Sequence, residues 1–133
     1  MSKKYTKLHE RLKKFYSSRP LNNILSHRLK SGSENTYMLS STVSSNILGS
    51  IAKKEGIHFE DTLTGFKWMG SRAKELIDQG KKVIFAFEEA IGFMYGSNVL
   101  DKDGVSAAAV MAEMINSLQE KNISLNQQLG TVY

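Results

Sequence analysis

Two neighbouring glutamates, Glu88 and Glu89, come directly after the apolar run at residues 83–87. A continuous apolar run is typical of a strand that is buried on both faces of a sheet. Because charged side chains are costly inside a core, we expect these two at the carboxyl end of the strand, where α/β sheets bind ligands. Adjacent residues of a strand point to opposite faces, so one of the two should enter a site.

A carboxylate in that position can accept hydrogen bonds from two adjacent hydroxyl groups, and sugars carry such pairs. This chemistry makes one of the two glutamates a candidate reader of sugar hydroxyls. The alternative is that both are solvated loop acids or that one caps a helix, and the two residues by themselves favour that alternative.

A turn at Thr64 and Gly65 leads into a helix that the apolar spacing predicts over residues 66–77. Glycine lets a ligand approach the backbone, and free N–H groups at the start of a helix attract phosphate. Lys67 adds a positive charge in the first turn, so these three residues are a candidate phosphate site. An ordinary capped helix start is the alternative. We expect Trp68 to be a packing residue because apolar residues flank it.

Lys102 lies just before a long helix that Asp101 or Asp103 is predicted to cap. A cation is disfavoured at the start of a helix unless an anion shares the site. Phosphate would be a suitable anion, and a mobile surface lysine is the alternative. The three histidines are isolated from one another and from acidic clusters, so we expect no metal site.

The elements that must position these residues alternate between strand and helix. Strands are predicted at 57–60, at 83–87 and from residues 37–39 into the polar Ser/Thr stretch that follows them. Helices are predicted after Ser44 or Ser45, over 66–77, after Asp101 or Asp103 and near Ser124, with a loop at 88–100. Gly56 and Gly80 are predicted to end the first two helices. This order indicates an α/β fold with a small mixed sheet flanked by helices. Three strands are few, so a further strand or covering element is expected.

The basic charge of the chain is concentrated near its N-terminus. Residues 1–36 hold nine Lys and Arg against two acidic residues, whereas residues 37–133 hold nine against eleven. We interpret residues 1–34 as a basic leader, helical or disordered, with a helix predicted over 4–16 by Leu8, Leu12 and Phe15. A solubilising leader is favoured over an arm that binds nucleic acid or a membrane surface.

Composition excludes several classes of protein. The chain has no cysteine, which excludes a disulfide framework and a thiolate metal site and fits a cytoplasmic protein. The longest apolar runs are too short to span a bilayer, and the start lacks the apolar core of a secretory signal. With 41% hydrophobic and 23% charged residues, the chain has the composition of one globular domain.

Three segments in this order and spacing carry a resemblance to a known family. They are TGFKWMG at 64–70, FEEAIG at 87–92 and DKDGV at 101–105. Residues 35–133 resemble the third, sugar-binding domain of the α-D-phosphohexomutases, which normally have four domains. The segment YMLSSTVSS at 37–45 is similar to the branch that holds phosphopentomutase, phosphoglucomutase and glucose-1,6-bisphosphate synthase.

The resemblance implies roles for individual residues. By motif position Glu88 binds the sugar, while Thr64, Gly65, Lys67 and Lys102 contact its phosphate. The family often has serine where this chain has Ala90, so one hydroxyl contact is lost. That departure favours ribose or deoxyribose phosphate over glucose phosphate.

Other parts of the family's machinery are absent from the sequence. Phosphoryl transfer needs a phosphoserine loop of Thr-Ala-Ser-His-Asn-Pro type, an Asp-x-Asp-x-Asp-Arg site for Mg²⁺, and a loop that grips the distal phosphate. None of these motifs occurs here. The apolar helix that opens the family's third domain is replaced by Lys-rich sequence, so we expect a truncated domain.

The resemblance therefore implies an inactive domain of a larger enzyme. The intact enzyme would use Mg²⁺ and a sugar bisphosphate, and this chain alone would bind neither cofactor and supply no catalytic residue. Its partners would be a sugar phosphate and the remaining phosphomutase domains, with no membrane or nucleic acid. The alternative is a non-enzymatic interaction module whose basic N-terminal arm binds nucleic acid, an acidic partner or a membrane surface.

Overall fold

A computed structural model describes residues 33–130 of the chain. The predicted helix over 4–16 and nearly all of the basic leader lie outside the described residues. The chain divides into two compact units. The described part of one unit, residues 33–108, contains the whole sheet. The described part of the other, residues 109–130, contains most of the long helix α5 (Gly104–Glu120) and the short helix α6 (Leu125–Gly130).

The sheet has four strands in the order β2-β1-β3-β4. They are β1 (Thr36–Ser41), β2 (His58–Thr62), β3 (Lys82–Glu88) and β4 (Gly92–Tyr95). Strand β1 pairs in parallel with both β2 and β3, whereas β4 pairs antiparallel with β3. The mixed sheet flanked by helices confirms the predicted fold class, and the three predicted strands are present with slightly different ends.

The prediction of an uninterrupted loop at 88–100 was wrong, because β4 lies within it. Strand β3 turns back through residues 89–91, and Glu88 pairs with Gly92 at the start of β4. The turn contains Ile91 in a left-handed conformation, with φ of 59°. Tight hairpins usually place glycine or asparagine at such a position, so the sequence carried no recognisable turn signal there. This hairpin supplies the further strand that was expected beyond the three predicted ones.

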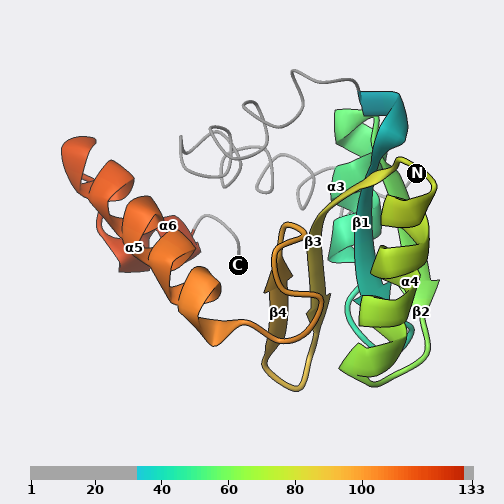
Figure 1. Cartoon of the computed structure of the whole chain (residues 1–133). Coiled ribbons are helices and arrows are strands. Elements are labelled where there is room, and N and C mark those ends of the chain that lie inside the picture. The colour runs from blue at the N-terminus through green and yellow to red at the C-terminus, as the bar shows by residue number, and fades with distance from the viewer. Residues whose placement is uncertain (1–32, 131–133) are drawn as a thin grey trace. The chain divides into compact units, whose positions relative to one another are not determined.

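Two helices cover opposite faces of the sheet, as Figure 1 shows around β1. Helix α4 (Phe66–Asp78) packs on the face that carries Leu39, and helix α3 (Ile47–Glu55) covers the other face, where Gly49 lies close to the ring of Phe59. The side chains that form the core between α4 and the sheet are Leu39, Phe66, Met69, Ala73, Leu76, Val83, Ala86 and Met94. This core fixes the start of α4 against the end of β3.

The ends of the helices agree with most of the sequence signals. Gly56 ends α3 with φ of 69°, and Gly80 follows α4 with φ of 76°. The prediction that Ser44 or Ser45 caps α3 was wrong, since Asn46 occupies the N-cap and makes no side-chain capping bond. Before α6, Ser124 and Gln127 bond to each other's backbone N–H at 3.2 and 2.7 Å, which is a capping box.

Candidate functional site

The loops that follow β1, β2 and β3 meet at one edge of the sheet, because these strands are parallel (Figure 1). The three loops contain residues 42–46, 63–65 and 89–91. In α/β proteins this carboxyl edge is where ligands bind. The helix starts and acidic residues predicted to form a site therefore lie where the topology favours one.

Glu88 is the last residue of β3, and only 6% of it is exposed. Gly92 of β4 lies close to both the Glu88 side chain and the ring of Phe66 at the start of α4. A methyl group added at Gly92 would fall 2.7 Å from Glu88 Cγ and 2.8 Å from the Phe66 ring. The position of this carboxylate thus depends on glycine at residue 92.

Lys102 provides the positive charge beside this carboxylate. Its Nζ lies 3.7 Å from Glu88 Oε1 and 5.6 Å from the centroid of the Phe66 ring. The anion that shares the site with Lys102 in this structure is therefore Glu88. Half of the lysine side chain is exposed, so the ammonium group can also meet solvent or a ligand.

The segment that carries Lys102 is tied to the sheet and to the next helix. Asp103 donates its backbone N–H to the Phe93 carbonyl of β4 at 2.8 Å. Its carboxylate accepts the N–H groups of Val105 and Ser106 and the Ser106 hydroxyl, and it thereby caps α5, as one of the two predicted caps. The Ser106 hydroxyl, followed by the two N–H groups, lowers the pKa of Asp103 below its ordinary value.

The predicted phosphate residues lie at the start of α4. Gly65 is the N-cap and has φ of 109° and ψ of 124°, a conformation that strains any other residue. Thr64 and Lys67 are exposed. Lys67 is placed over the indole of Trp68, with its Nζ 5.5 Å from the ring centroid. The first turn of α4 thus presents the cation of Lys67 to solvent, next to the buried Phe66.

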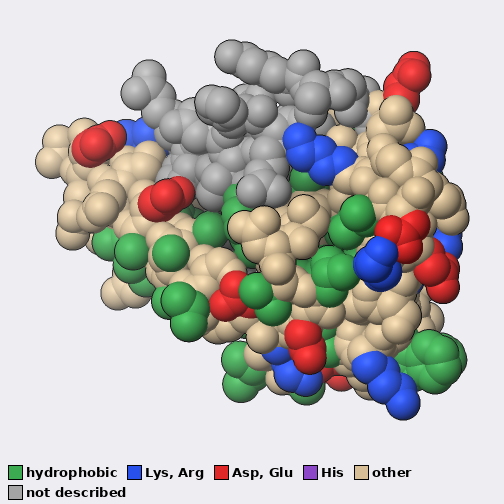
Figure 2. All heavy atoms as spheres, viewed as in Figure 1, with side chains coloured by type: hydrophobic (Ala, Val, Ile, Leu, Met, Phe, Trp, Pro, Cys, Tyr) green, Lys and Arg blue, Asp and Glu red, His purple; other side chains and the backbone are tan. Residues whose placement is uncertain are grey.

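The expectation that Trp68 is a packing residue was wrong, since 47% of it is exposed. Val43, Leu63 and Ile91 are also more than half exposed, and each belongs to one of the three loops at the carboxyl edge. Figure 2 shows hydrophobic, basic and acidic side chains together at the end of the molecule to which β1 and β3 point in Figure 1. The edge is therefore a mixed apolar and charged surface.

Glu89 turns away from Glu88 and contacts the end of β1, as expected for adjacent residues of a strand. Its Oε2 accepts hydrogen bonds from Ser44 Oγ at 2.7 Å and Ser41 Oγ at 3.1 Å. The Ser44 hydroxyl, then the backbone N–H of Glu89 and the Ser41 hydroxyl, lower the pKa of Glu89. Sequence reasoning missed this cluster, although the serine-rich run at 40–45 was a signal for it.

Ala90 lies exposed in the turn after Glu89 and brings no hydrogen-bonding side chain. The structure therefore gathers the six predicted residues at one edge but in three groups. Glu88 and Lys102 are in contact, Thr64, Gly65 and Lys67 form the start of α4, and Ala90 stands apart in the hairpin turn.

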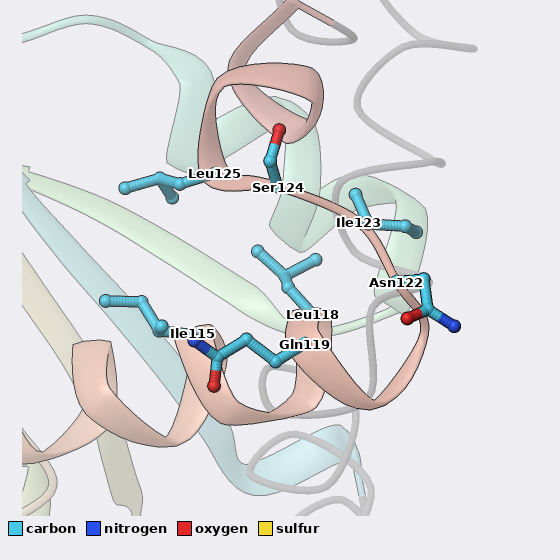
Figure 3. Close-up of a pocket in the computed structure, with 7 residues that line it drawn as sticks. All are labelled: Ile115, Leu118, Gln119, Asn122, Ile123, Ser124 and Leu125. Carbon is cyan, nitrogen blue, oxygen red and sulfur yellow. The ribbon is translucent and has the colours of Figure 1, made fainter.

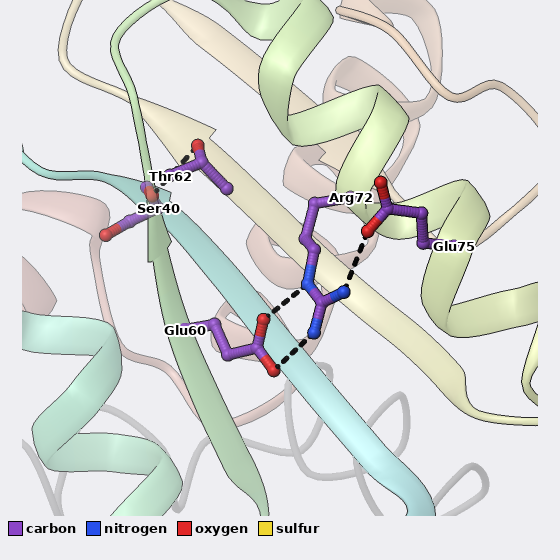
Figure 4. A network of polar contacts seen from close by, with 5 residues as sticks. All are labelled: Ser40, Glu60, Thr62, Arg72 and Glu75. Atoms are coloured by element: carbon purple, nitrogen blue, oxygen red, sulfur yellow. Dashed lines mark hydrogen bonds and ion pairs between the residues drawn. The ribbon is translucent and has the colours of Figure 1, made fainter.

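An ion-pair network farther along α4 joins this helix to the sheet (Figure 4). Arg72 donates from Nε and Nη2 to the two carboxylate oxygens of Glu60 at 2.7 and 3.1 Å, and from Nη1 to Glu75 at 2.8 Å. These bonds raise the pKa of Arg72, chiefly through Glu60. Since Glu60 belongs to β2, the network ties α4 to the edge strand.

Other kinds of site are not supported by the described residues. Within residues 33–130 no group of three or more His, Asp or Glu side chains could hold a metal ion. A hollow between α5 and α6 is lined by Ile115, Leu118, Gln119, Asn122, Ile123, Ser124 and Leu125 (Figure 3). It contains no charged group and none of the predicted site residues. No helix in the described part is long and apolar enough to cross a membrane.

Comparison with known proteins places these observations in a family. Residues 21–133 match the family model described as phosphoglucomutase/phosphomannomutase, alpha/beta/alpha domain III. The chain is 67% identical over 104 residues to a phosphopentomutase of Homo sapiens, covering 78% of this chain and 17% of that protein. It is 63% identical over 100 residues to a glucose 1,6-bisphosphate synthase of Homo sapiens, covering 75% of this chain and 16% of that protein.

A more distant relative is a phosphoribomutase of Saccharomyces cerevisiae, 54% identical over 76 residues, or 57% of this chain and 12% of that protein. Among solved structures, a protein described as a putative phosphomannomutase from Thermus thermophilus aligns with a TM-score of 0.57 at 19% identity. That alignment covers 86% of this chain and 24% of the other, and it supports the fold alone. The chain thus spans about one sixth of the curated relatives it matches first.

Proposed function

Since this chain belongs to the phosphoglucomutase/phosphomannomutase family and carries its alpha/beta/alpha domain III, we propose that it is the sugar-phosphate-recognising part of a phosphomutase. The extent of the domain is part of the proposal. Residues 35–133 form it and residues 1–34 are a basic leader, although the family model matches from residue 21.

The observation that carries the proposal is the setting of Glu88. A nearly buried carboxylate stands at the carboxyl edge of the sheet, with one oxygen 3.7 Å from the ammonium group of Lys102. A carboxylate of this kind accepts hydrogen bonds from two neighbouring sugar hydroxyls, and Lys102 keeps it compensated when no sugar is present. We therefore assign the hydroxyl contact to Glu88, and not to Glu89, whose oxygen already accepts from two serines.

The phosphate group of the ligand is assigned to the start of α4. Thr64 and Lys67 are exposed there, and Gly65 has no side chain that would cover the backbone. The free N–H groups of a helix start and the charge of Lys67 favour an anion. Lys102, which is half exposed, adds a second cation that can turn from Glu88 towards the phosphate.

The choice of sugar follows from Ala90 and from the relatives. An alanine in the exposed turn offers no hydroxyl to a hexose. The similar proteins carry the names phosphopentomutase and phosphoribomutase as well as glucose 1,6-bisphosphate synthase. We propose a pentose phosphate as the preferred ligand and a hexose phosphate as the weaker one.

Catalysis is assigned to parts that this chain does not contain. No phosphoserine loop or Asp-x-Asp-x-Asp-Arg motif occurs in the sequence, so the chain by itself should not transfer phosphate. The side chains of residues 33–130 do not fit a Mg²⁺ site, and no step is assigned to a metal on this domain. In a whole phosphomutase, the remaining domains would supply the phosphoryl group and the metal that neutralises its charge.

The proposal is tested by mapping ligand contacts with nuclear magnetic resonance. We expect α-D-ribose 1-phosphate to shift the amide signals of residues 62–70 and 87–104 in the full chain, and Glu88→Gln to weaken the effect. Glu75→Gln removes the same charge from an exposed position of α4 and serves as the control. Absence of shifts in both regions at millimolar ligand would refute sugar-phosphate recognition.

The same preparation tests the alternative function. An interaction module with a basic arm should bind a polyanion such as heparin in a salt-dependent way and lose that binding when residues 1–34 are deleted. The nine basic residues in 1–36 are the feature that motivates this second candidate. Binding to heparin together with no response to the sugar phosphate would place it first.

A further inference from the structure

Glu89 takes part in a closed set of hydrogen bonds that the sugar contact does not use. Its Oε2 accepts from the hydroxyls of Ser44 and Ser41, its own backbone N–H donates to Ser44 Oγ at 3.1 Å, and the two serine oxygens are 2.6 Å apart. The hydroxyl groups of Ser41 and Ser44 have one proton each for three side-chain contacts, two to the carboxylate and one between the serines. Each proton can therefore be donated either to Glu89 or to the other serine. The carboxylate thus has both of its hydroxyl partners in one short segment at the end of β1.

These contacts connect two loops at the point where the backbone ladder stops. The pairing of β1 with β3 ends at Ser40 and Phe87, whereas Ser41 ends β1 and Glu89 follows β3. The side-chain bonds therefore continue the attachment between the two strands beyond the last backbone pair. They fix the turn at residues 89–91 against the loop at 42–46.

Glu88 lies between this attachment and the hairpin. It pairs with Gly92 in β4, and the next residue in the chain is Glu89, which bonds to Ser41 and Ser44. The turn at residues 89–91 contains Ile91 in a left-handed conformation. Because 84% of Ile91 is exposed, its side chain has little packing support. A non-glycine residue in this conformation persists where its surroundings hold it, and Glu89, two residues before Ile91, makes side-chain bonds that can do so.

We propose that Glu89 is a positioning residue: by bonding to Ser41 and Ser44 it holds the hairpin turn and so sets where the Glu88 carboxylate meets a sugar. This inference rests on the proposed function for its ligand but not for its geometry. It separates the two adjacent glutamates into one that touches the sugar and one that acts through its neighbour.

The test compares two probes on the full chain. We expect Glu89→Gln and Ser44→Ala to weaken binding of α-D-ribose 1-phosphate about tenfold, because the sugar contact of Glu88 is displaced. Binding of inorganic phosphate, which needs the start of α4 and no hydroxyl reader, should change by less than about twofold. Ser44→Thr keeps the hydroxyl and should retain the affinity, and Glu75→Gln is the charge-matched control.

A second readout does not depend on any ligand. Amide hydrogen exchange at residues 89–92 should become about tenfold faster in Glu89→Gln and Ser44→Ala, while amides of α4 exchange at the wild-type rate. Ser44→Ala provides the same information if Glu89→Gln does not fold.

The outcomes separate this inference from the proposed function. Equal weakening of both probes, or unchanged exchange at residues 89–92, would overturn the positioning role. If the wild-type chain binds neither probe, the proposed function fails, and the exchange rates alone then decide whether Glu89 holds the turn that carries Glu88.

Discussion

Glu88 Oε1 lies 3.7 Å from Lys102 Nζ, although Glu88 is the last residue of β3 and Lys102 belongs to the segment just before α5. The glutamate is almost fully buried, whereas half of the lysine side chain is exposed. The pair therefore has one fixed member and one that can move. This asymmetry suits a site in which the Glu88 carboxylate stays in place to accept hydrogen bonds from hydroxyl groups. Lys102 can then move from Glu88 to the phosphate of the ligand.

Replacing Lys102 by methionine should lower the stability of the chain at neutral pH. The substitution leaves a buried carboxylate without its cation, and a pair with one exposed partner contributes up to about 1 kcal/mol. A double-mutant cycle of Lys102→Met with Glu88→Gln, measured by urea unfolding, should show favourable coupling of about 0.5 kcal/mol or more. Lys74→Met, which breaks an exposed pair within α4, is the control and should show no coupling to Glu88.

Gly92→Ala should destabilise the chain even though the substitution is small. The new methyl group would fall 2.7 Å from Glu88 Cγ and 2.8 Å from the Phe66 ring, so one of the two must move. Overpacking of this kind costs about 1–3 kcal/mol. Gly104→Ala is a suitable control, because nothing lies within 4 Å of a methyl group there. Equal unfolding midpoints for the two variants would contradict the packing described for Glu88.

Arg72→Met should loosen the attachment of α4 to β2. The guanidinium bonds to Glu60 through two nitrogens, but about a third of each side chain is exposed. Solvent screening therefore limits the expected loss to about 1 kcal/mol, despite the raised pKa of Arg72. Glu75→Gln removes the more exposed partner and should cost less than Glu60→Gln. The reverse order of unfolding free energies would show that the network does not hold the edge strand.

Stability should decrease in acid because two carboxylates have lowered pKa values in the folded chain. For Asp103 and Glu89 the folded pKa lies below the ordinary values of 3.8 and 4.5. The stabilising effect is therefore fully present above those values and is lost as the pH falls through the folded pKa. Asp103→Asn and Glu89→Gln should each reduce the decline of the urea midpoint between neutral pH and about pH 3. If the urea midpoint of either variant fell as steeply with pH as that of the unaltered chain, the hydrogen bonds of that carboxylate would not stabilise the fold.

Much of the architecture was predictable because the local signals agreed with one another. The apolar run 83–87, the helical spacing after Gly65 and the glycines at 56 and 80 each specify one element, and all of these elements are present. The carboxyl edge followed from the order of strands and helices. The family was also identified correctly from three short segments and its branch with the further segment at 37–45, as the family model and the curated relatives confirm.

The remaining features depend on contacts that a pattern does not reveal. Strand β4 was missed because Ile91 adopts a conformation for which isoleucine is not a signal. Serine is a residue type that often caps helices, yet the hydroxyl of Ser44 bonds to Glu89, 45 residues away in sequence. Trp68 has apolar neighbours in sequence, but its position in the first turn of α4 directs it to solvent beside Lys67. Each outcome was decided by tertiary structure.

The central claim is that Glu88 reads the hydroxyl groups of a sugar phosphate. Its most direct test is the dissociation constant of α-D-ribose 1-phosphate, measured by titration calorimetry for the full chain and for Glu88→Gln. We predict measurable binding that weakens about tenfold or more in the variant, equivalent to about 1.4 kcal/mol, since the amide replaces a charged acceptor. Equal affinity of the two proteins, or no binding by either, would contradict the claim.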